Sequence, residues 1–214
     1  MTKRAQQAGR EAVDGRVLRG DRSRQAIVDA LYDLLRAGEL EPSAEAVAAR
    51  AGVGVRTVFR QFADMESLFE ALDARVRAEV LQLADLTAPT GDLEADVRAV
   101  VARRARVFEH MAPFRRSGRI VRHRSTFLRA QDRAFHRTLR AMVEALVTPH
   151  LAPDRGDTVE ALDLLLSFEA WDRLRDAQGL SRAHAERVQL DAALSLLRAA
   201  APVSGSSRTG TPAR

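Results

Sequence analysis

The sequence predicts an all-α protein, and three observations support that fold class. Apolar side chains recur at intervals of three and four residues along most of the chain, the period of a helix with one buried face. β-branched and aromatic residues do not alternate over several positions, so strand patterns are missing. With 214 residues, 46% of them hydrophobic, the chain is long enough to bury a substantial core.

Cap and turn residues divide the first half of the chain into helices. Ser43 and Asp64 are expected N-caps, and Gly38 and Gly52 stand where helices end. Residues 1–20 mix basic residues with Gly and polar residues and are expected to form a flexible basic arm. We expect helices over about residues 22–37, 43–52, 55–62 and 64–85.

Proline and glycine divide the second half in the same way. Expected breaks are the turn at Thr87–Gly91, Pro113, the segment from Pro149 to Pro153, and Gly179. Residues 202–214 have the composition of a disordered tail. We expect helices over about residues 92–111, 118–149, 156–178 and 181–201.

The composition excludes several classes of protein. The chain has no Cys, which excludes disulfides, thiolate zinc sites and cysteine nucleophiles. No apolar segment follows the N-terminal residues, and no run approaches the ~18 uncharged apolar residues of a membrane span. We therefore expect a cytoplasmic protein that is not associated with a membrane.

Known enzyme signatures are also missing. The sequence has no phosphate-binding loop, no dinucleotide-binding glycine motif, no serine nucleophile elbow and no H-E-x-x-H zinc motif. His110, His123 and His136 have no His, Asp or Glu four residues further on, so a metal site is not expected. We predict that the protein is not an enzyme and holds no cofactor or metal.

The spacing Ala48-x3-Gly52-x5-Val58 is typical of a helix-turn-helix. A small residue at Ala48 lets two helices cross closely, Gly52 can adopt positive φ, and Val53 with Val58 fills the small core. The second helix then offers polar groups to a major groove, where Arg pairs with guanine and Gln with adenine. From the spacing alone, an ordinary helical hairpin is the alternative.

The surrounding residues favour DNA binding. The run from Ser43 to Phe69 reads SAEAVAARAGVGVRTVFRQFADMESLF and strongly resembles the DNA-binding domain of TetR-family transcriptional regulators. The resemblance covers about residues 22–75 and implies an N-terminal three-helix helix-turn-helix domain followed by a helical-bundle regulatory domain. The implied division is a basic arm at 1–20, a DNA-binding domain at 21–75 with its motif at about 43–62, a ligand-binding and dimerisation domain at 76–201, and a tail at 202–214.

The resemblance assigns roles to individual residues. Val55 and Arg56 stand where bases are read, Thr57 and Phe59 where phosphate and groove are touched, Arg60 and Gln61 beside the backbone, and Ser43 near a phosphate. The full set of implied DNA-binding residues is Arg22, Arg24, Ser43, Gly54, Val55, Arg56, Thr57, Phe59, Arg60 and Gln61.

Three residues depart from the family pattern. Gly54 replaces the usual Ser, Phe59 lacks a Tyr hydroxyl, and Met65 replaces a Lys that binds phosphate. These departures remove phosphate contacts, so DNA affinity is expected to depend more on the basic arm, Arg56 and Arg60.

The resemblance also implies a function. The expected protein is a homodimeric repressor that binds a pseudo-palindromic operator in double-stranded DNA and is released by a small-molecule effector. The alternative is a helical architectural protein that binds DNA with little sequence preference and has no effector.

Two sets of apolar residues in the second half are candidates for the ligand and dimer sites. For both sets, ordinary core packing is the alternative. The first set, which would line a ligand cavity, is Phe108, Met111, Phe114, Phe127, Phe135 and Met142. The second set, which would form a dimer interface, is Leu164, Trp171, Leu174, Leu190, Leu194 and Leu197.

Positive charge is concentrated in one segment. The formal net charge is +5, whereas residues 98–140 hold 13 Arg against Glu109 and Asp132. Four of these arginines recur along one helical face, at positions 129, 133, 137 and 140. A solvated face, a site for an anionic ligand such as an acyl-coenzyme A, and a DNA-facing helix are the three interpretations.

Overall fold

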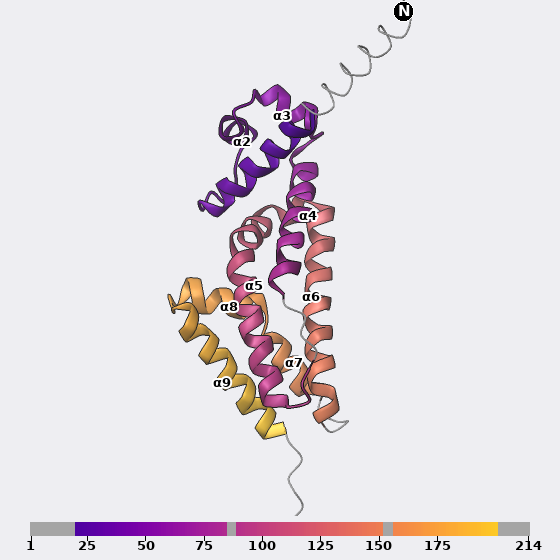
Figure 1. Cartoon of the computed structure of the whole chain (residues 1–214), viewed down its shortest axis with the longest axis vertical. Coiled ribbons are helices and arrows are strands. Elements are labelled where there is room, and N and C mark those ends of the chain that lie inside the picture. The colour runs from indigo at the N-terminus through magenta and orange to yellow at the C-terminus, as the bar shows by residue number, and fades with distance from the viewer. Residues whose placement is uncertain (1–19, 85–88, 152–155, 201–214) are drawn as a thin grey trace, which may run out of the picture. The chain divides into compact units, whose positions relative to one another are not determined.

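The chain folds into helices joined by short turns (Figure 1). The computed structural model describes residues 20–84, 89–151 and 156–200, and no strand occurs in these ranges. The predicted all-α fold class is confirmed. The arm predicted at 1–20 lies outside the described residues except for its last residue, and the tail predicted at 202–214 lies wholly outside them.

The four helices predicted in the first half are present. Asp64 caps the fourth as expected, because its Oδ1 accepts a hydrogen bond of 2.8 Å from the backbone N–H of Ser67. The helices are residues 20–36, α2 (Ala44–Ala51), α3 (Val55–Gln61) and α4 (Met65–Leu83).

The second half contains longer and more interrupted helices than the sequence predicts. Its elements are α5 (Leu93–Val121), the 3-10 turn η1 (Arg122–Arg124), α6 (Thr126–Val147), the 3-10 turn η2 (Thr148–His150), α7 (Gly156–Leu165), α8 (Phe168–Asp172), the π-helical turn η3 (Arg173–Ala177) and α9 (Arg182–Ala200).

The prediction that Pro113 separates two helices is wrong. Pro113 lies inside α5, and the break comes at η1 instead, so the helix predicted from 118 begins at Thr126. A proline inside a helix removes one backbone hydrogen bond. Packing offsets that cost here. Met111 and Phe114 pack against the buried core that the 20–36 helix shares with α2, α3 and α4, and the Phe114 ring centroid lies 4.9 Å from that of Tyr32.

The prediction of one helix over 156–178 is also wrong. Ser167 has extended backbone angles, and its hydroxyl accepts a hydrogen bond of 3.1 Å from the N–H of Ala170. Ser167 therefore acts as an N-cap, which ends α7 and starts α8. After α8, residues Arg173–Ala177 form a π-helical turn, a conformation that is rare and often found at functional sites.

The described chain divides into two compact units. We call residues 20–82 with 110–132 the N-terminal unit, and residues 83–84, 89–109, 133–151 and 156–200 the C-terminal unit. Both α5 and α6 contribute residues to each unit.

The core of the N-terminal unit joins its first four helices. Each helix supplies apolar side chains that are almost fully buried, so the helices hold one another in place. The principal members are Ile27, Leu31, Leu35, Val47, Ala48, Val58, Phe62, Leu68, Leu72 and Val76.

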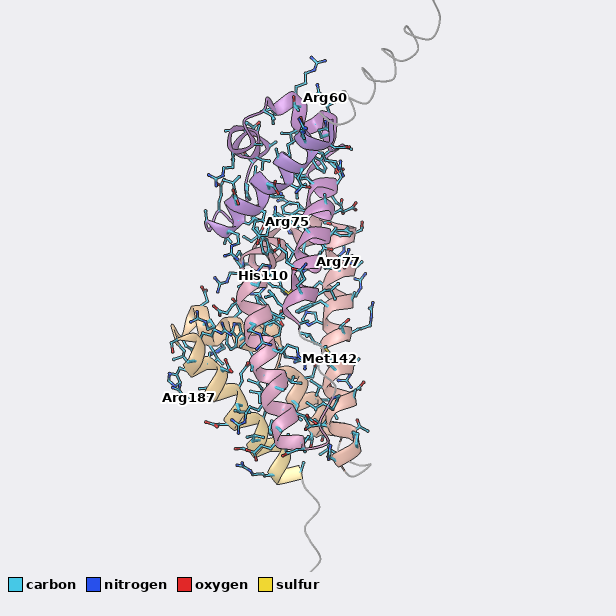
Figure 2. All side chains as sticks on the ribbon, in the orientation of Figure 1. Arg60, Arg75, Arg77, His110, Met142 and Arg187 are labelled. Carbon is cyan, nitrogen blue, oxygen red and sulfur yellow. The ribbon has the colours of Figure 1, made fainter. Side chains whose placement is uncertain are left out.

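A polar cluster beside this core links three helices. Glu79 of α4 accepts hydrogen bonds from the Tyr32 hydroxyl (2.9 Å) and from Nε of Arg75 (3.1 Å). His110 of α5 brings Nε2 to 2.8 Å from the same carboxylate, and Arg75 also pairs with Asp29 (Arg75 and His110 are labelled in Figure 2). These contacts hold α4 and the last turns of α5 against the 20–36 helix.

The C-terminal unit has its own core, in which α7 packs against α9. Its buried apolar residues are Val97, Val101, Val143, Leu146, Val147, Leu162, Leu166, Ala193, Leu194 and Leu197. A buried cation ties the helices together, because Arg104 donates to the carbonyl oxygens of Leu166 (2.6 Å) and Leu139 (2.7 Å). Burial lowers the pKa of Arg104 to about 10, which leaves it charged at neutral pH.

Glu109 forms a second polar link in the C-terminal unit. Its carboxylate accepts hydrogen bonds from Nε1 of Trp171 (3.0 Å) and from Nε and the second terminal nitrogen of Arg175 (2.6 and 3.1 Å). Burial raises the pKa of Glu109, but the hydrogen bonds and charge of Arg175 outweigh it, and the net shift lowers that pKa.

The lowered pKa of Glu109 predicts a pH-dependent contribution to stability. A carboxyl group whose pKa is lower in the folded chain stabilises the fold above its unfolded pKa of about 4.3 and loses that effect as the pH falls through the folded value. We expect Glu109→Gln to reduce the free energy of unfolding by about 1 kcal/mol at pH 7, and by progressively less between pH 5 and pH 3. Urea unfolding of both proteins across this range measures the difference. Glu186→Gln on α9 is the control, and a difference for Glu109→Gln that stays constant with pH contradicts the assignment.

Candidate nucleic-acid interface

The interface begins at the N-terminal end of α2, where Ser43 is the N-cap. The Ser43 hydroxyl accepts a hydrogen bond of 3.2 Å from the N–H of Ala46, and the residue remains exposed. The predicted cap is confirmed. The opposite face of α2 buries Val47 and Ala48, so the helix presents its N-terminus to solvent while its apolar face packs on the core.

The turn between α2 and α3 depends on one left-handed residue. Gly52 has φ 66° and ψ 31°, and its N–H donates to the carbonyl oxygens of Ala48 and Ala49. The N–H of Val53 then donates to Ala48 at 3.0 Å, which closes the end of α2. The positive φ predicted for Gly52 is confirmed, and Ala48 is only 2% exposed, as a close helix crossing requires.

The seven residues of α3 have one buried face and one exposed face. Val58 and the C-cap residue Phe62 are 1% and 2% exposed, whereas Arg56 and Arg60 are exposed and Phe59 is 49% exposed. Figure 2 places Arg60 at the outer edge of the unit. Val55, Thr57 and Gln61 are half-buried beside these residues. The exposed face of α3 therefore combines cationic, hydroxyl, amide and aromatic groups, the chemistry that reads base edges and binds phosphates.

Arg24 has a role that sequence reasoning missed. A terminal nitrogen of its guanidinium donates to the Gln61 carbonyl oxygen at 2.6 Å, and the guanidinium carbon lies 4.1 Å from the centroid of the Phe62 ring. Arg24 thus closes the C-terminal end of α3, where carbonyl groups lack helical partners. No local sequence signal indicates this contact, because 37 residues separate the two partners. Arg22 is exposed on the same helix.

Glu66 is a second residue that sequence reasoning missed. It lies in the first turn of α4, and its Oε1 accepts hydrogen bonds from the Ser125 hydroxyl (2.6 Å) and from the N–H of Phe127 (3.3 Å). The Ser125 hydroxyl also accepts from the N–H of Leu128 at 3.0 Å. One carboxylate therefore joins the start of α4, a few residues after α3, to the start of α6.

The six residues predicted to line a ligand cavity do not lie in one unit. Met111 and Phe114 pack against the core of the N-terminal unit, to which Phe127 also belongs. The other three, Phe108, Phe135 and Met142, lie in the C-terminal unit. Phe108 is fully buried there, with its ring edge-on to Phe168 at 5.6 Å between centroids.

The predicted dimer residues differ in exposure. Leu164 of α7 is 72% exposed. Leu174 and Leu190 are half-buried. The remaining three are buried within the protomer, namely Trp171, Leu194 and Leu197.

Neither a metal cluster nor a membrane helix is found in the ranges that the structure describes. No group of three or more His, Asp or Glu side chains there could hold a metal ion. No helix of those ranges is long and apolar enough to cross a membrane.

The two glycines of the turn predict opposite effects on stability. Ala at position 52 retains the strained positive φ, so we expect Gly52→Ala to reduce the free energy of unfolding by about 1 kcal/mol. Gly54 has an extended backbone, with φ −75° and ψ 149°, and no side chain to cap α3. We expect Gly54→Ser to supply a capping hydroxyl and to raise the free energy of unfolding by about 0.5–1 kcal/mol. Thermal and urea unfolding measure both. Equal effects of the two substitutions contradict this account of the turn.

Comparison with known proteins agrees with this geometry. Residues 27–72 match the family model for bacterial regulatory proteins of the tetR family. No curated protein matches the chain in sequence.

Two solved structures share the fold. A transcriptional regulator from Rhodococcus sp. Rha1 has a TM-score of 0.63 and 19% identity, with 86% of this chain and 98% of that chain covered. A protein from Mesorhizobium loti assigned to the TetR family of transcriptional regulators has a TM-score of 0.54 and 20% identity, with 86% and 99% covered. These likenesses support the fold, and the family match covers the helix-turn-helix. The matched family is one of DNA-binding regulators rather than enzymes. Residues 27–72, which contain the helix-turn-helix, therefore form a DNA-binding domain of the type found in bacterial regulatory proteins of the tetR family.

Proposed function

We propose that the chain is a homodimeric transcriptional repressor that binds a pseudo-palindromic operator through α3 and is released by a small-molecule effector. It acts in the cytoplasm. The observation that carries this proposal is the two-faced α3, which buries Val58 against the core and exposes Arg56 and Arg60. A short helix held in this way can enter a major groove without losing its packing.

The exposed residues of α3 suit two kinds of contact. Arg56 lies in the first turn of α3, the part of a recognition helix that contacts base edges, and its guanidinium can pair with guanine. Arg60, Thr57 and Gln61 suit phosphate and sugar contacts beside it. Ser43 at the start of α2 and Arg22 on the 20–36 helix extend these backbone contacts.

The small size of α3 supports dimerisation. One recognition helix of seven residues reads few base pairs, so specific binding needs a second copy on a half-site one helical turn away. The C-terminal unit offers Leu164, a large apolar side chain that is 72% exposed on α7. We place the self-association surface there and on the half-buried residues Leu174 and Leu190.

An effector would act by favouring one arrangement of the dimer over another. We assign ligand binding and dimerisation to residues 76–201 and DNA binding to residues 21–75, as the family resemblance implies. Both α5 and α6 supply residues to the two compact units, so they are the elements through which a ligand would affect DNA binding. A coupling free energy of ~1–3 kcal/mol between effector and operator is sufficient for release.

Fluorescence anisotropy with fragments of the source genome tests the proposal. The full chain is titrated into labelled fragments at two salt concentrations with competitor DNA. Tight retention of one pseudo-palindromic fragment, saturating at two chains per site, supports the repressor. Weak binding to every fragment that disappears in salt instead favours an architectural protein without sequence preference.

Two arginine substitutions separate base reading from phosphate binding. We expect Arg56→Ala to cost about 1–3 kcal/mol in operator affinity and to relax the preference at one base pair. Arg22→Ala is expected to weaken binding to all DNA sequences alike. It should also lower the slope of log affinity against log salt concentration by about one. Competition among operator variants, each with one altered base pair, measures both effects. Unchanged affinity for both variants in matched salt contradicts the assignment of α3.

Leu164 predicts how the chain self-associates. We expect Leu164→Glu to convert a dimer into a monomer, because the substitution places a charge in an apolar interface. Leu81→Glu is the matched control, since Leu81 of α4 is 69% exposed but lies in the N-terminal unit. Light scattering after size-exclusion chromatography measures the mass. A Leu164→Glu protein that remains dimeric excludes this surface.

A further inference from the structure

We propose that the turn between α5 and α6 is a second DNA-binding surface, which contacts the phosphate backbone next to the site of α3. We call this surface the η1 basic turn and define it by Arg119, Arg122, Arg124 and Arg129. The inference rests on the proposed function and adds to it a surface outside the helix-turn-helix. Its partner is the sugar-phosphate backbone of duplex DNA.

The charge balance of the N-terminal unit is the first observation. Residues 20–82, which contain the helix-turn-helix, carry eight basic and eleven acidic side chains, a net charge of −3. Residues 110–132 carry six Arg and one Asp, a net charge of +5. Both ranges belong to the same compact unit. Residues 1–19 carry five basic and two acidic side chains, so residues 1–82 have no net charge, and the second range gives the unit its net positive charge.

The position of the turn is the second observation. Ser125 directly follows η1, and its hydroxyl lies 2.6 Å from the Glu66 carboxylate in the first turn of α4. Glu66 is only five residues beyond Gln61, the last residue of α3. The turn therefore lies beside the start of α4, the helix that follows the recognition helix in the chain.

Local contacts show how the turn presents these charges. Arg129 donates to the His123 carbonyl oxygen at 2.9 Å, and Arg122 pairs with Asp132, so both side chains fix the turn. Arg124 is exposed and donates through Nε to Nε2 of His123 at 2.9 Å. Nδ1 of His123 lies 2.9 Å from the Ile120 carbonyl oxygen, which makes Nδ1 the protonated nitrogen and Nε2 the acceptor. The hydrogen bond to His123 thus orients the Arg124 guanidinium, whose two terminal nitrogens can donate to a phosphate.

Salt dependence is the measurement that tests this surface. Each phosphate contact contributes about 0.9 to the slope of log affinity against log salt, so Arg119→Ala/Arg124→Ala should lower the slope by about 1.8. The loss of affinity between about 50 and 200 mM salt should then be about tenfold smaller than for the unsubstituted chain. The probe is a labelled random-sequence duplex of about 30 base pairs, which needs no knowledge of the operator. Arg137→Ala, an exposed arginine of α6 in the C-terminal unit, is the control.

Two further variants distinguish the possible outcomes. Arg124→Lys keeps the charge and should retain most of the slope that Arg124→Ala loses, whereas loss in both indicates a structural role and overturns the proposal. Circular dichroism and thermal melting confirm that each variant is folded. If Arg119→Ala/Arg124→Ala keeps the salt slope of the unsubstituted chain while Arg56→Ala/Arg60→Ala reduces it, the η1 surface is overturned and the proposed function stands. A normal slope for both double variants overturns both.

Discussion

The burial of Val58 and Phe62 against the 20–36 helix and α4 is the constraint on which the DNA-binding surface depends. A helix of seven residues is unstable in isolation, because the cost of nucleation exceeds what so few hydrogen bonds return. Packing against the rest of the N-terminal unit must therefore stabilise α3. Gly52 sets the direction from which the chain enters the helix, and Arg24 satisfies the carbonyl group at its end. Arg56 and Arg60 are exposed, so they lie outside the core packing that holds the helix.

Two carboxylates of α4 extend this constraint along the N-terminal unit. Glu66 at the start of the helix binds the first residues of α6, and Glu79 near its end joins Tyr32, Arg75 and His110. Burial raises the pKa of Glu79, but the hydrogen bonds from Arg75 and Tyr32 outweigh it and lower that pKa, so the group is ionised at neutral pH. Any shift of α5 or α6 within the unit must break or move these charged contacts. Therefore α4 connects the recognition helix to the helices that follow it.

Local sequence patterns predicted the features that depend on neighbouring residues. The caps at Ser43 and Asp64 and the left-handed Gly52 each involve contacts within a few positions. Long-range packing decided the rest. Pro113 continues a helix because Phe114 stacks near Tyr32, which lies about eighty residues earlier in the chain, and the Glu66 and Ser125 pair spans 59 residues. The spacing of apolar residues does not report which partner a side chain will meet, so it cannot separate a ligand or dimer surface from the core. Leu194 and Leu197, for example, lie in the core of the C-terminal unit.

The distribution of charge separates specificity from affinity. A recognition helix gains specificity from a few base contacts, whereas phosphate contacts supply most of the sequence-independent affinity. Residues 20–82 are net acidic, and the basic residues 1–19 bring residues 1–82 only to a net charge of zero. Residues 110–132 belong to the same compact unit and carry a net charge of +5, so they are its main source of net positive charge. This separation lets α3 keep only a few arginines, since long-range attraction does not have to come from the residues that discriminate between bases.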